Sequence, residues 1–424
     1  MVPNDANRTI EAVWRIESPR LLAGLARLTR DVGVAEDLAQ EALLSALERW
    51  PQTGVPDNPG AWLMAVAKNR ALDLLRRAKR LERKHEELSG ELGGSWTSAE
   101  SSLDAALDDD IGDDLLRLIF TACHPVLSPE ARTALTLRML GGLTTEEIAR
   151  AFLVPVSTIS QRIVRAKRTL AEARVPFEIP RGAERAARLA SVLEVIYLVF
   201  NEGYAATAGE DWVRPELCDD ALRLGRVLAG LVPEEPEVHG LVALTEIQAS
   251  RMGARTGPSG EPVLLLNQDR SRWDRLLIGR GLAALDRATA LATAAGGALG
   301  PYTLQAAIAA CHARARTAEE TDWPRIVALY DALARTAPSP VVELNRAVAV
   351  AMAFGPAAGL EIVDALLAEP ALASYHLLPA VRGDLLVKLG RHEEARAEFE
   401  RAADLTRNAR ERDLMLARAA EHRA

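Results

Sequence analysis

The stretch TTEEIARAFLVPVSTISQRIVRAKR, residues 144–168, decides the fold of the region around it. Thr144 and Glu147 have the spacing of a capping box, in which each side chain accepts a hydrogen bond from the other residue's backbone, so a helix is predicted to begin here. Pro155 ends that helix, because proline lacks a backbone donor and restricts the residue before it. Ser157 is then placed to cap a second helix. Two short helices with a tight break between them predict a helix-turn-helix.

The second helix of this motif is expected to have two different faces. Ile159, Ile163 and Ala166 recur at helical spacing and should point into a core. The other face carries hydroxyl, amide and guanidinium groups, on Thr158, Ser160, Gln161, Arg162, Arg165 and Arg168. Such groups can hydrogen-bond to base edges and phosphates in a DNA major groove. An ordinary helical hairpin with a solvated basic face is the alternative.

Composition predicts an all-α protein of two or three domains. The chain has 424 residues, 49% hydrophobic and only 4% aromatic, and a chain of that length usually divides into domains. Alanine, leucine, arginine and glutamate are abundant, which favours helix. No convincing alternation of apolar and polar residues predicts a sheet.

The sequence also predicts a soluble, cytoplasmic protein that holds no metal and no cofactor. Cys123, Cys218 and Cys311 lie far apart, in neither a metal-binding spacing nor an even disulfide set, so we expect buried free thiols in a reducing compartment. The N-terminus lacks the apolar stretch of a signal peptide. No apolar run reaches the roughly 18 residues needed to span a bilayer.

Charge is segregated along the chain, although the net charge is only −8. Residues 68–84 hold eight basic and two acidic side chains, whereas residues 85–116 hold ten acidic side chains and no lysine or arginine. The acidic segment is also rich in glycine and serine, which predicts a linker. Its carboxylates either imitate nucleic acid and cover basic DNA-binding faces, or simply solvate a spacer.

Residues 8–84 are predicted to form a first helical unit. In the helix expected over 35–50, one polar, acidic patch forms at i, i+3 and i+4, from Asp37, Gln40 and Glu41. The loop WPQTGVPDNPG, residues 50–60, cannot be helical throughout. In the next helix, over about 60–84, one exposed face combines an amide, an acid and several cations, on Asn69, Asp73, Arg76, Arg77, Arg80 and Lys84. This face suits phosphate binding, or it is a solvated helix end.

The second half is predicted to be a run of amphipathic helices. Ser128-Pro129-Glu130 begins the helix that leads into the helix-turn-helix, and VPFEIPRG, residues 175–182, marks a domain boundary. Near the end, small and aromatic positions resemble tetratricopeptide repeats, at Gly355, Gly390, Ala395, Phe399 and Ala402. Stacked helix pairs of that kind usually form a partner-binding surface, and a plain helical bundle is the alternative.

Two polar clusters interrupt these apolar helices, at Asn201–Tyr204 and at Gln268–Trp273. We interpret them as buried hydrogen-bond networks that fix helix packing, and assign no ligand to them.

Taken together, these segments resemble bacterial sigma factors of the extracytoplasmic-function (ECF) type. AEDLAQEALLSALERWP (35–51) and GAWLMAVAKNRALDLLRRAKR (60–80) are similar to their second conserved region, and residues 127–170 are similar to their fourth. The rest resembles a subgroup with a long helical C-terminal extension containing tetratricopeptide-like repeats, in strings such as YLVFNEGYAATAGEDW (197–212) and LLLNQDRSRWDRLLIGRGL (264–282).

The resemblance implies a domain organisation and three sets of site residues. It implies region 2 over 1–87, an acidic flexible linker over 88–112, region 4 over 113–175, and a regulatory extension over 183–424, tetratricopeptide-like at about 340–407. Core RNA polymerase would bind the patch of Asp37, Gln40 and Glu41. The minus-ten promoter element would meet Trp62, Asn69, Arg70, Asp73, Arg76, Arg77 and Arg80. The minus-thirty-five element would meet Ser157, Thr158, Ser160, Gln161, Arg162, Arg165, Lys167 and Arg168.

The resemblance therefore implies promoter-specific transcription initiation with core polymerase and promoter DNA as partners, a protein partner for the extension, and no membrane. The alternative is a regulator that binds DNA alone through the helix-turn-helix and senses a signal through its helical domain. An enzyme is not expected. Gly279-Arg280-Gly281 lacks the third glycine and the preceding strand of a dinucleotide fingerprint, and His124, His239 and His376 are interpreted as structural.

Overall fold

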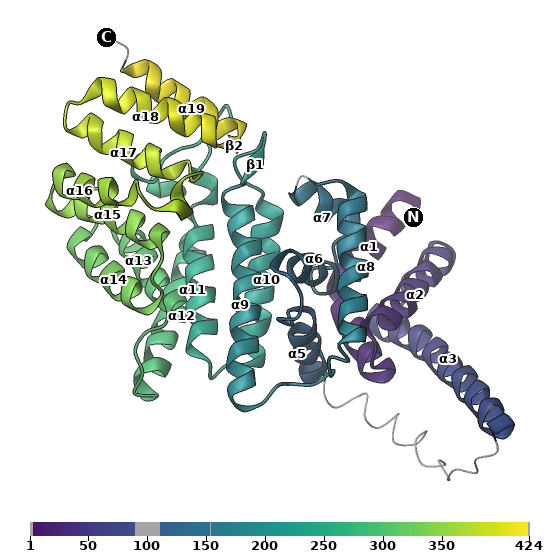
Figure 1. The fold of residues 1–424 in the computed structure, drawn as a ribbon. Helices are drawn as coiled ribbons and strands as arrows, with labels where there is room; N and C mark the ends of the chain where they lie inside the picture. The colour runs from purple at the N-terminus through teal and green to yellow at the C-terminus, as the bar shows by residue number, and fades with distance from the viewer. Residues whose placement is uncertain (1–2, 90–110, 153, 423–424) are drawn as a thin grey trace. The chain divides into compact units, whose positions relative to one another are not determined.

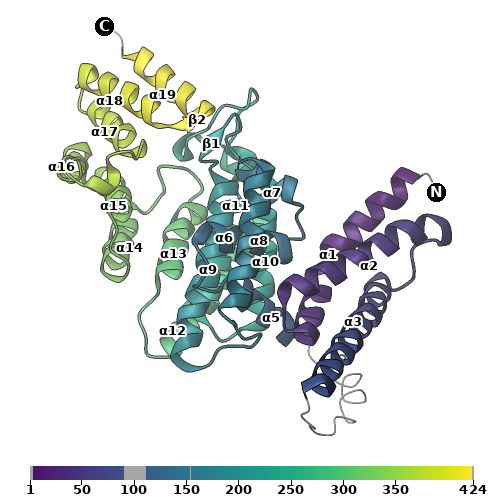
Figure 2. The ribbon, with the colours of Figure 1, turned by 45° about the vertical axis from the view of Figure 1, so that its right-hand side comes forward.

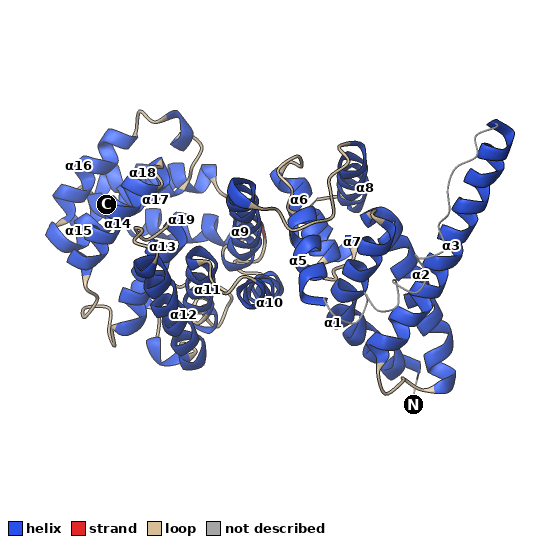
Figure 3. Ribbon diagram, turned by 90° about the horizontal axis from the view of Figure 1, so that it is seen from below, coloured by secondary structure: helices blue, strands red, loops and turns tan. Residues whose placement is uncertain are grey.

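The computed structural model describes residues 3–89, 111–152 and 154–422. Within these residues the regular structure is almost entirely helical, apart from two strands of two residues each (Figure 3), so the all-α prediction is confirmed. The chain divides into two compact units, Met1–Val195 and Ile196–Ala424. Helix α9 (Gly182–Tyr204) crosses the boundary between them.

The first three helices of the first unit pack together: α1 (Pro3–Thr29), α2 (Val32–Thr53) and α3 (Pro59–Ser89) (Figure 2). Asp31 caps α2 by accepting hydrogen bonds from the backbone N–H groups of Gly33 and Val34 at 2.7 and 3.0 Å. The helix continues through Pro51 and ends at Gly54, whose φ of +84° suits glycine. The expected 50–60 loop is therefore shorter than the sequence suggests, since its first residues still belong to α2.

The helix-turn-helix forms as predicted within a group of four helices: α5 (Ile111–Ala122), α6 (Pro129–Met139), α7 (Thr145–Phe152) and α8 (Val156–Glu172). The capping box is present, because Thr144 N–H donates to Glu147 at 2.7 Å and Glu147 N–H donates to the Thr144 hydroxyl at 3.1 Å. Ser128 caps α6 as expected. The prediction for Ser157 was wrong, since the N-cap of α8 is Pro155, two residues earlier, and α8 has no side-chain cap.

The second unit is a succession of antiparallel helices (Figure 1). Its helices after α9 are α10 (Pro215–Leu231), α11 (Pro236–Ala249), α12 (Arg275–Ala294), α13 (Pro301–Arg314), α14 (Trp323–Thr336), α15 (Pro340–Phe354), α16 (Pro356–Leu366), α17 (Leu377–Lys388), α18 (His392–Leu405) and α19 (Ala409–Glu421). Four short 3-10 turns are η1 (Met252–Ala254), η2 (Leu265–Asn267), η3 (Arg270–Arg272) and η4 (Pro370–Leu372).

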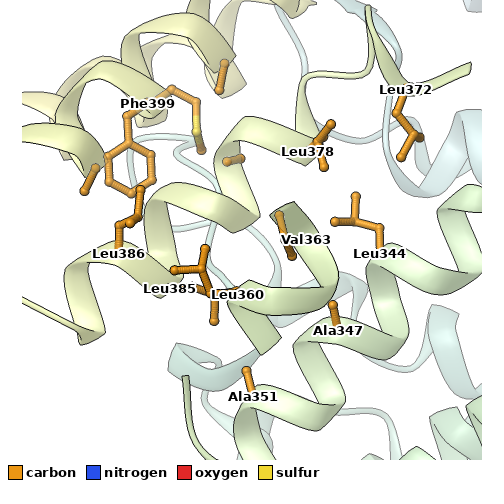
Figure 4. Close-up of a cluster of buried hydrophobic side chains, with 14 of the residues drawn as sticks. Leu344, Ala347, Ala351, Leu360, Val363, Leu372, Leu378, Leu385, Leu386 and Phe399 are labelled. Carbon is orange, nitrogen blue, oxygen red and sulfur yellow. The ribbon is translucent and has the colours of Figure 1, made fainter. Parts of the chain in front are cut away.

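Helices α15 to α19 share one apolar core (Figure 4). Phe399 of α18 is fully buried at one end of this core, beside Leu386 of α17. Gly383 lets the two helices approach, since a Cβ there would lie 2.7 Å from the Phe399 ring. Gly355 and Gly390, 35 residues apart, both have positive φ and occupy equivalent turns after α15 and α17. The helix pairs are real, while their assignment to the tetratricopeptide class stays a prediction.

The second unit is closed by a contact between its two ends in sequence. Strand β1 (Ala208–Gly209) pairs in parallel with β2 (Arg407–Asn408). The fully buried Asn408 amide donates to the carbonyls of Ala206 and Asp211 at 3.1 and 2.7 Å. Its side-chain oxygen caps α19 by accepting hydrogen bonds from the backbone N–H groups of Arg410 and Glu411. One side chain therefore joins the start of the extension to its last helix.

We expect Asn408→Ala to destabilise the extension by about 2–4 kcal/mol, because it removes an N-cap, worth about 1 kcal/mol, and leaves the buried Ala206 carbonyl without this donor, at about 1–3 kcal/mol. Urea unfolding of the full chain measures the loss, and hydrogen exchange at 205–211 and 407–421 locates it. Asn345→Ala, at an exposed position of α15, is the matched control. Equal unfolding of the two variants would contradict the closure.

Candidate nucleic-acid interface

The exposed face of α3 carries most of the residues predicted for it. Asn69, Asp73, Arg76 and Arg77 are all exposed. Trp62 is half-buried and packs edge-on against Trp50, with ring centroids 5.3 Å apart. The backbone of Arg80 continues α3, but its side chain, like that of Lys84, lies outside the described residues. An indole at the base of the helix and cations along it can hold a nucleic-acid backbone beside an aromatic platform.

Arg70 lies off this face and connects α3 to α2. Its guanidinium donates to Glu41 at 2.9 Å and to the Ser45 hydroxyl at 3.0 Å. The structure thereby brings together two residues that were predicted for different partners, Arg70 for promoter DNA and Glu41 for polymerase. Because both side chains are well exposed, the ion pair is a weak one that a partner can displace.

The acidic patch on α2 is only partly open. Asp37 and Glu41 are exposed, whereas the Gln40 amide donates to Glu36 at 3.0 Å. Glu36 itself was not among the predicted residues, and it is 5% exposed. Its position one turn before Gln40 turns the carboxylate away from the patch and towards region 4.

The exposed face of α8 matches the prediction for most of its residues. Its exposed polar side chains are Ser157, Ser160, Gln161, Arg165 and Arg168, and its half-buried ones are Thr158 and Arg162. Arg168 is paired with Glu172 at 2.6 Å, one turn on, and both are highly exposed. On the opposite side Ile159, Ile163 and Ala166 are buried, as expected. Hydroxyl, amide and guanidinium groups therefore share one solvent-facing surface.

Lys167 does not lie on that surface in this structure, so its predicted contact with the minus-thirty-five element stays a prediction. Its ammonium lies 2.9 Å from one oxygen of Glu36, and Arg138 Nε lies 2.7 Å from the other. Burial acts to raise the pKa of Glu36, but Lys167 and Arg138 outweigh it and hold the pKa below its ordinary value. Glu36 is thus an ionised, buried carboxylate between α2, α6 and α8.

Two further ion pairs join the helices on either side of the linker. Arg15 of α1 binds Glu147 of α7 at 3.1 Å. Arg27 of α1 binds the buried Asp114 of α5 at 3.0 Å. Within α5, Arg117 also binds Asp114, at 2.6 Å. Asp114 was grouped with the acidic stretch that could cover DNA-binding faces. The structure corrects this, because Asp114 lies in the first turn of α5 and is held there by Arg27 and Arg117. Asp108–Asp110 lie outside the described residues.

The described residues contain no group of three or more histidine, cysteine, aspartate or glutamate side chains that could hold a metal ion. The three cysteines are buried free thiols, as predicted, and burial raises the pKa of Cys123 to about 11. His239 lies 2.9 Å from the Pro233 carbonyl, and His376 lies 3.0 Å from Glu411. The His124 ring accepts from Val126 N–H. These contacts are with the protein's own chain.

Comparison with known proteins identifies the two modules. Residues 14–81 match the sigma-70 region 2 family and residues 117–170 match the sigma-70 region 4 family. These matches contain α3 and α8 with their exposed faces. The chain belongs to the ECF type of the sigma-70 family. Residues 188–289 of this sigma factor match a family of unknown function, DUF6596.

Three relatives match different shares of this sigma factor. An uncharacterised protein of Rhizobium meliloti is 46% identical over 93% of this chain and 91% of its own length. A probable ECF RNA polymerase sigma factor, SigI, of Mycobacterium tuberculosis is 30% identical over 42% of this chain and 59% of its own length. The chain therefore spans less than two thirds of SigI. A probable RNA polymerase sigma factor, RfaY, of Xanthomonas campestris is 42% identical over 15% of each chain.

In the described part of the sigma factor, no helix combines the length and apolar character needed to cross a membrane.

We expect Glu36→Gln to lower the stability of the first unit by about 3 kcal/mol at pH 7, because it leaves two half-buried cations, Arg138 and Lys167, without their anion. The carboxylate's pKa is depressed in the folded state, so its contribution is present above the unfolded pKa of about 4.3 and lost as pH falls through the folded value. Urea unfolding of both proteins at several pH values should therefore show the difference shrinking below about pH 4.

Glu41→Gln is the matched control on the same helix, since its exposed ion pair is worth less than about 1 kcal/mol. A Glu36→Gln protein as stable as Glu41→Gln at neutral pH would show that the buried carboxylate does not stabilise the contact between the two modules.

Proposed function

We propose that this sigma factor binds core RNA polymerase, directs it to promoters through α3 and α8, and is controlled by its helical extension. The observation that supports it most is the pair of solvent-facing polar surfaces, on α3 and on α8, in modules that match region 2 and region 4. Transcription initiation requires no chemistry from the factor, and the proposal assigns none to it.

Each surface has a proposed part of the promoter. Asn69, Asp73, Arg76 and Arg77 of α3, with Trp62 at its base and Arg80 further along it, are proposed to meet the minus-ten element. The exposed groups of α8, with Arg162 and Thr158 at the margin, are proposed to meet the minus-thirty-five element, where guanidinium and amide groups can recognise bases directly.

The polymerase is proposed to bind α2 through Asp37, Gln40 and Glu41. An acidic surface is complementary to a basic partner, which favours rapid and specific docking. Glu41 is held by Arg70 in the free protein. Polymerase binding would release Arg70, which then becomes available to the minus-ten element beside it.

The contact between the modules is proposed to be a resting arrangement. The two promoter elements are separated by about 25 base pairs, roughly 85 Å of duplex at 3.4 Å per step. Glu36 on α2 and Lys167 on α8 are 2.9 Å apart, so the two modules must separate before both elements are bound. Separation would also free Lys167 for the phosphate backbone.

Arg165→Ala is expected to weaken promoter binding by the polymerase complex about 5- to 100-fold, because a guanidinium contact to a base or phosphate contributes about 1–3 kcal/mol. Run-off transcription from a promoter library with purified core polymerase measures it. Arg181→Ala, an exposed arginine beyond α8, is the control. If neither variant alters initiation, α8 is not the recognition helix.

Two truncations are expected to separate the extension's own role from its effect on the first unit. Ser191 in the first half of α9 donates to the Cys123 carbonyl at 2.6 Å, so removal of everything after Pro180 also disturbs region 4. A chain ending at Tyr204 keeps α9. We expect both truncations to lose most promoter-dependent transcription while still binding core polymerase in pull-down assays.

Unchanged output and unchanged regulation in the chain ending at Tyr204 would refute control by the extension. The alternative function, a regulator that binds DNA alone, predicts instead that the full chain binds duplex DNA tightly without polymerase.

A further inference from the structure

Three arginines are buried side by side in the first part of the extension. Arg251, Arg255 and Arg270 are 7%, 8% and 7% exposed. Arg251 and Arg255 flank η1 and Arg270 begins η3. They connect the two polar clusters noted in the sequence, because Arg255 contacts Tyr204 in one and Arg270 contacts Trp273 in the other.

These arginines alternate with aromatic rings. The Arg255 guanidinium lies 3.6 Å from the ring centre of Tyr204 and 5.2 Å from that of Trp212. The Arg251 guanidinium lies 5.7 Å from Tyr204 and 5.9 Å from Trp273. At the other end of the series, the Arg270 guanidinium lies 4.9 Å from the ring centre of Trp273. We call this set of six side chains the arginine ladder.

The ladder's cations are hydrogen-bonded only to neutral acceptors. Arg251 donates to the Gln248 side chain and Arg255 to the Tyr204 carbonyl. Arg270 donates to two carbonyls and a hydroxyl, those of His312, Ala315 and Thr321. Among the described residues no carboxylate lies within 4 Å of any of the three guanidiniums as an ion pair. Glu319 and Glu320, which are exposed, act on Arg270 only at longer range.

This arrangement differs from that of Arg214 in the same unit, a half-buried arginine that binds the carboxylate of Glu202. A buried charge without a counter-ion is costly, because desolvation is not repaid by a partner. Three such charges also repel one another. Burial and the neighbouring Arg251 both lower the pKa of Arg255 and of Arg270, and burial with Arg251 and Arg270 lowers the pKa of His312 to about 3.

The ladder also has more donors than acceptors. Four buried N–H groups have no acceptor among the described residues: Nε of Arg251, Nε of Arg255, and the indole Nε1 of Trp212 and of Trp273. Buried polar groups are nearly always hydrogen-bonded in folded proteins. An excess of donors in a positive field is the arrangement that an oxyanion would complete.

We propose that the arginine ladder binds a small oxyanion of the phosphate class. A phosphate group carries about −1.5 to −2 charge at neutral pH and presents three acceptor oxygens, which matches several cations and several N–H groups. Guanidiniums already lie over the rings of Tyr204 and Trp273, so the proposal assigns the ligand to the cations and N–H groups and assigns no stacked nucleobase. The deep burial of the arginines restricts the ligand to inorganic phosphate or the terminal phosphate of a small metabolite.

Isothermal titration calorimetry and thermal unfolding of the full chain test the proposal, with inorganic phosphate, sulfate and glycerol phosphate as probes and chloride at matched ionic strength as the baseline. We expect saturable binding of phosphate at one site, a raised Tm, and a change in tryptophan fluorescence from Trp273. Binding of phosphate alone identifies the free ion, and tighter binding of glycerol phosphate identifies a phosphomonoester.

Arg251→Gln should weaken phosphate binding about 10- to 100-fold, since a hydrogen bond to a charged group contributes about 1.5–3 kcal/mol. Arg396→Gln, at an exposed position of α18, should bind as the wild type does. Trp273→Phe keeps an aromatic side chain and removes the indole N–H, so it should weaken binding less than Arg251→Gln.

If the ladder served only to stabilise the fold, Arg251→Gln would lower the Tm whether or not phosphate was present. The proposal predicts a different result. In phosphate-free buffer we expect Arg251→Gln to be at least as stable as the wild type, because it relieves repulsion between buried cations. An Arg251→Gln protein that is less stable than the wild type by the same amount with and without phosphate would overturn the proposal. So would a wild-type Tm that responds to phosphate no more than to chloride.

Discussion

The first unit depends on one buried carboxylate. Glu36 is placed by α2 between Arg138 of α6 and Lys167 of α8, and it is the most buried ionic contact by which α2 holds the region 4 helices, beside the pairs that α1 makes with α5 and α7. A hydrophobic contact at this position would be stronger and harder to reverse. A buried ion pair costs desolvation that its partners only partly repay, so such a contact holds a defined geometry without making separation prohibitive.

That property suits a factor whose modules must act far apart. The contact withdraws Lys167 from the surface of α8, while the Arg70–Glu41 pair occupies one residue of each neighbouring surface. Both contacts are ionic, and both can be exchanged for ionic contacts to a partner. Lys167 and Arg70 can bind phosphates instead of carboxylates, and Glu41 can bind a basic protein surface instead of Arg70. The free energy lost on opening is therefore partly recovered on binding, which makes the exchange of partners easier than it would be for an apolar interface.

Local sequence signals predicted the elements well and the long-range contacts poorly. The capping box at Thr144 and Glu147 and the Ser128 cap depend on residues three positions apart. Donor and acceptor are therefore both visible in a short stretch of sequence. Ser157 was assigned wrongly because Pro155 already fixes the backbone two residues earlier. The partners of Glu36 lie 102 and 131 residues away. No periodicity links positions so distant. In the sequence Glu36 stands next to Asp37, so it is indistinguishable from the other members of a solvated acidic patch.

The extension shows the same limit on a larger scale. Helix spacing and turn glycines predict its hairpins, because a positive φ at Gly355 or Gly390 is a local requirement. Its closure is not local, since Asn408 binds carbonyls about 200 residues earlier.

The two polar clusters of the sequence were interpreted as packing networks, and each does contribute a ring to the arginine ladder. The arginines between those rings come from η1 and η3, and what sets them apart is the absence of an ion-paired acid among the described residues, which only the three-dimensional arrangement reveals. A network that existed to fix packing would satisfy its donors internally, as Asn408 does; the ladder leaves four of them without an acceptor, and this contrast within one unit is what favours a ligand there.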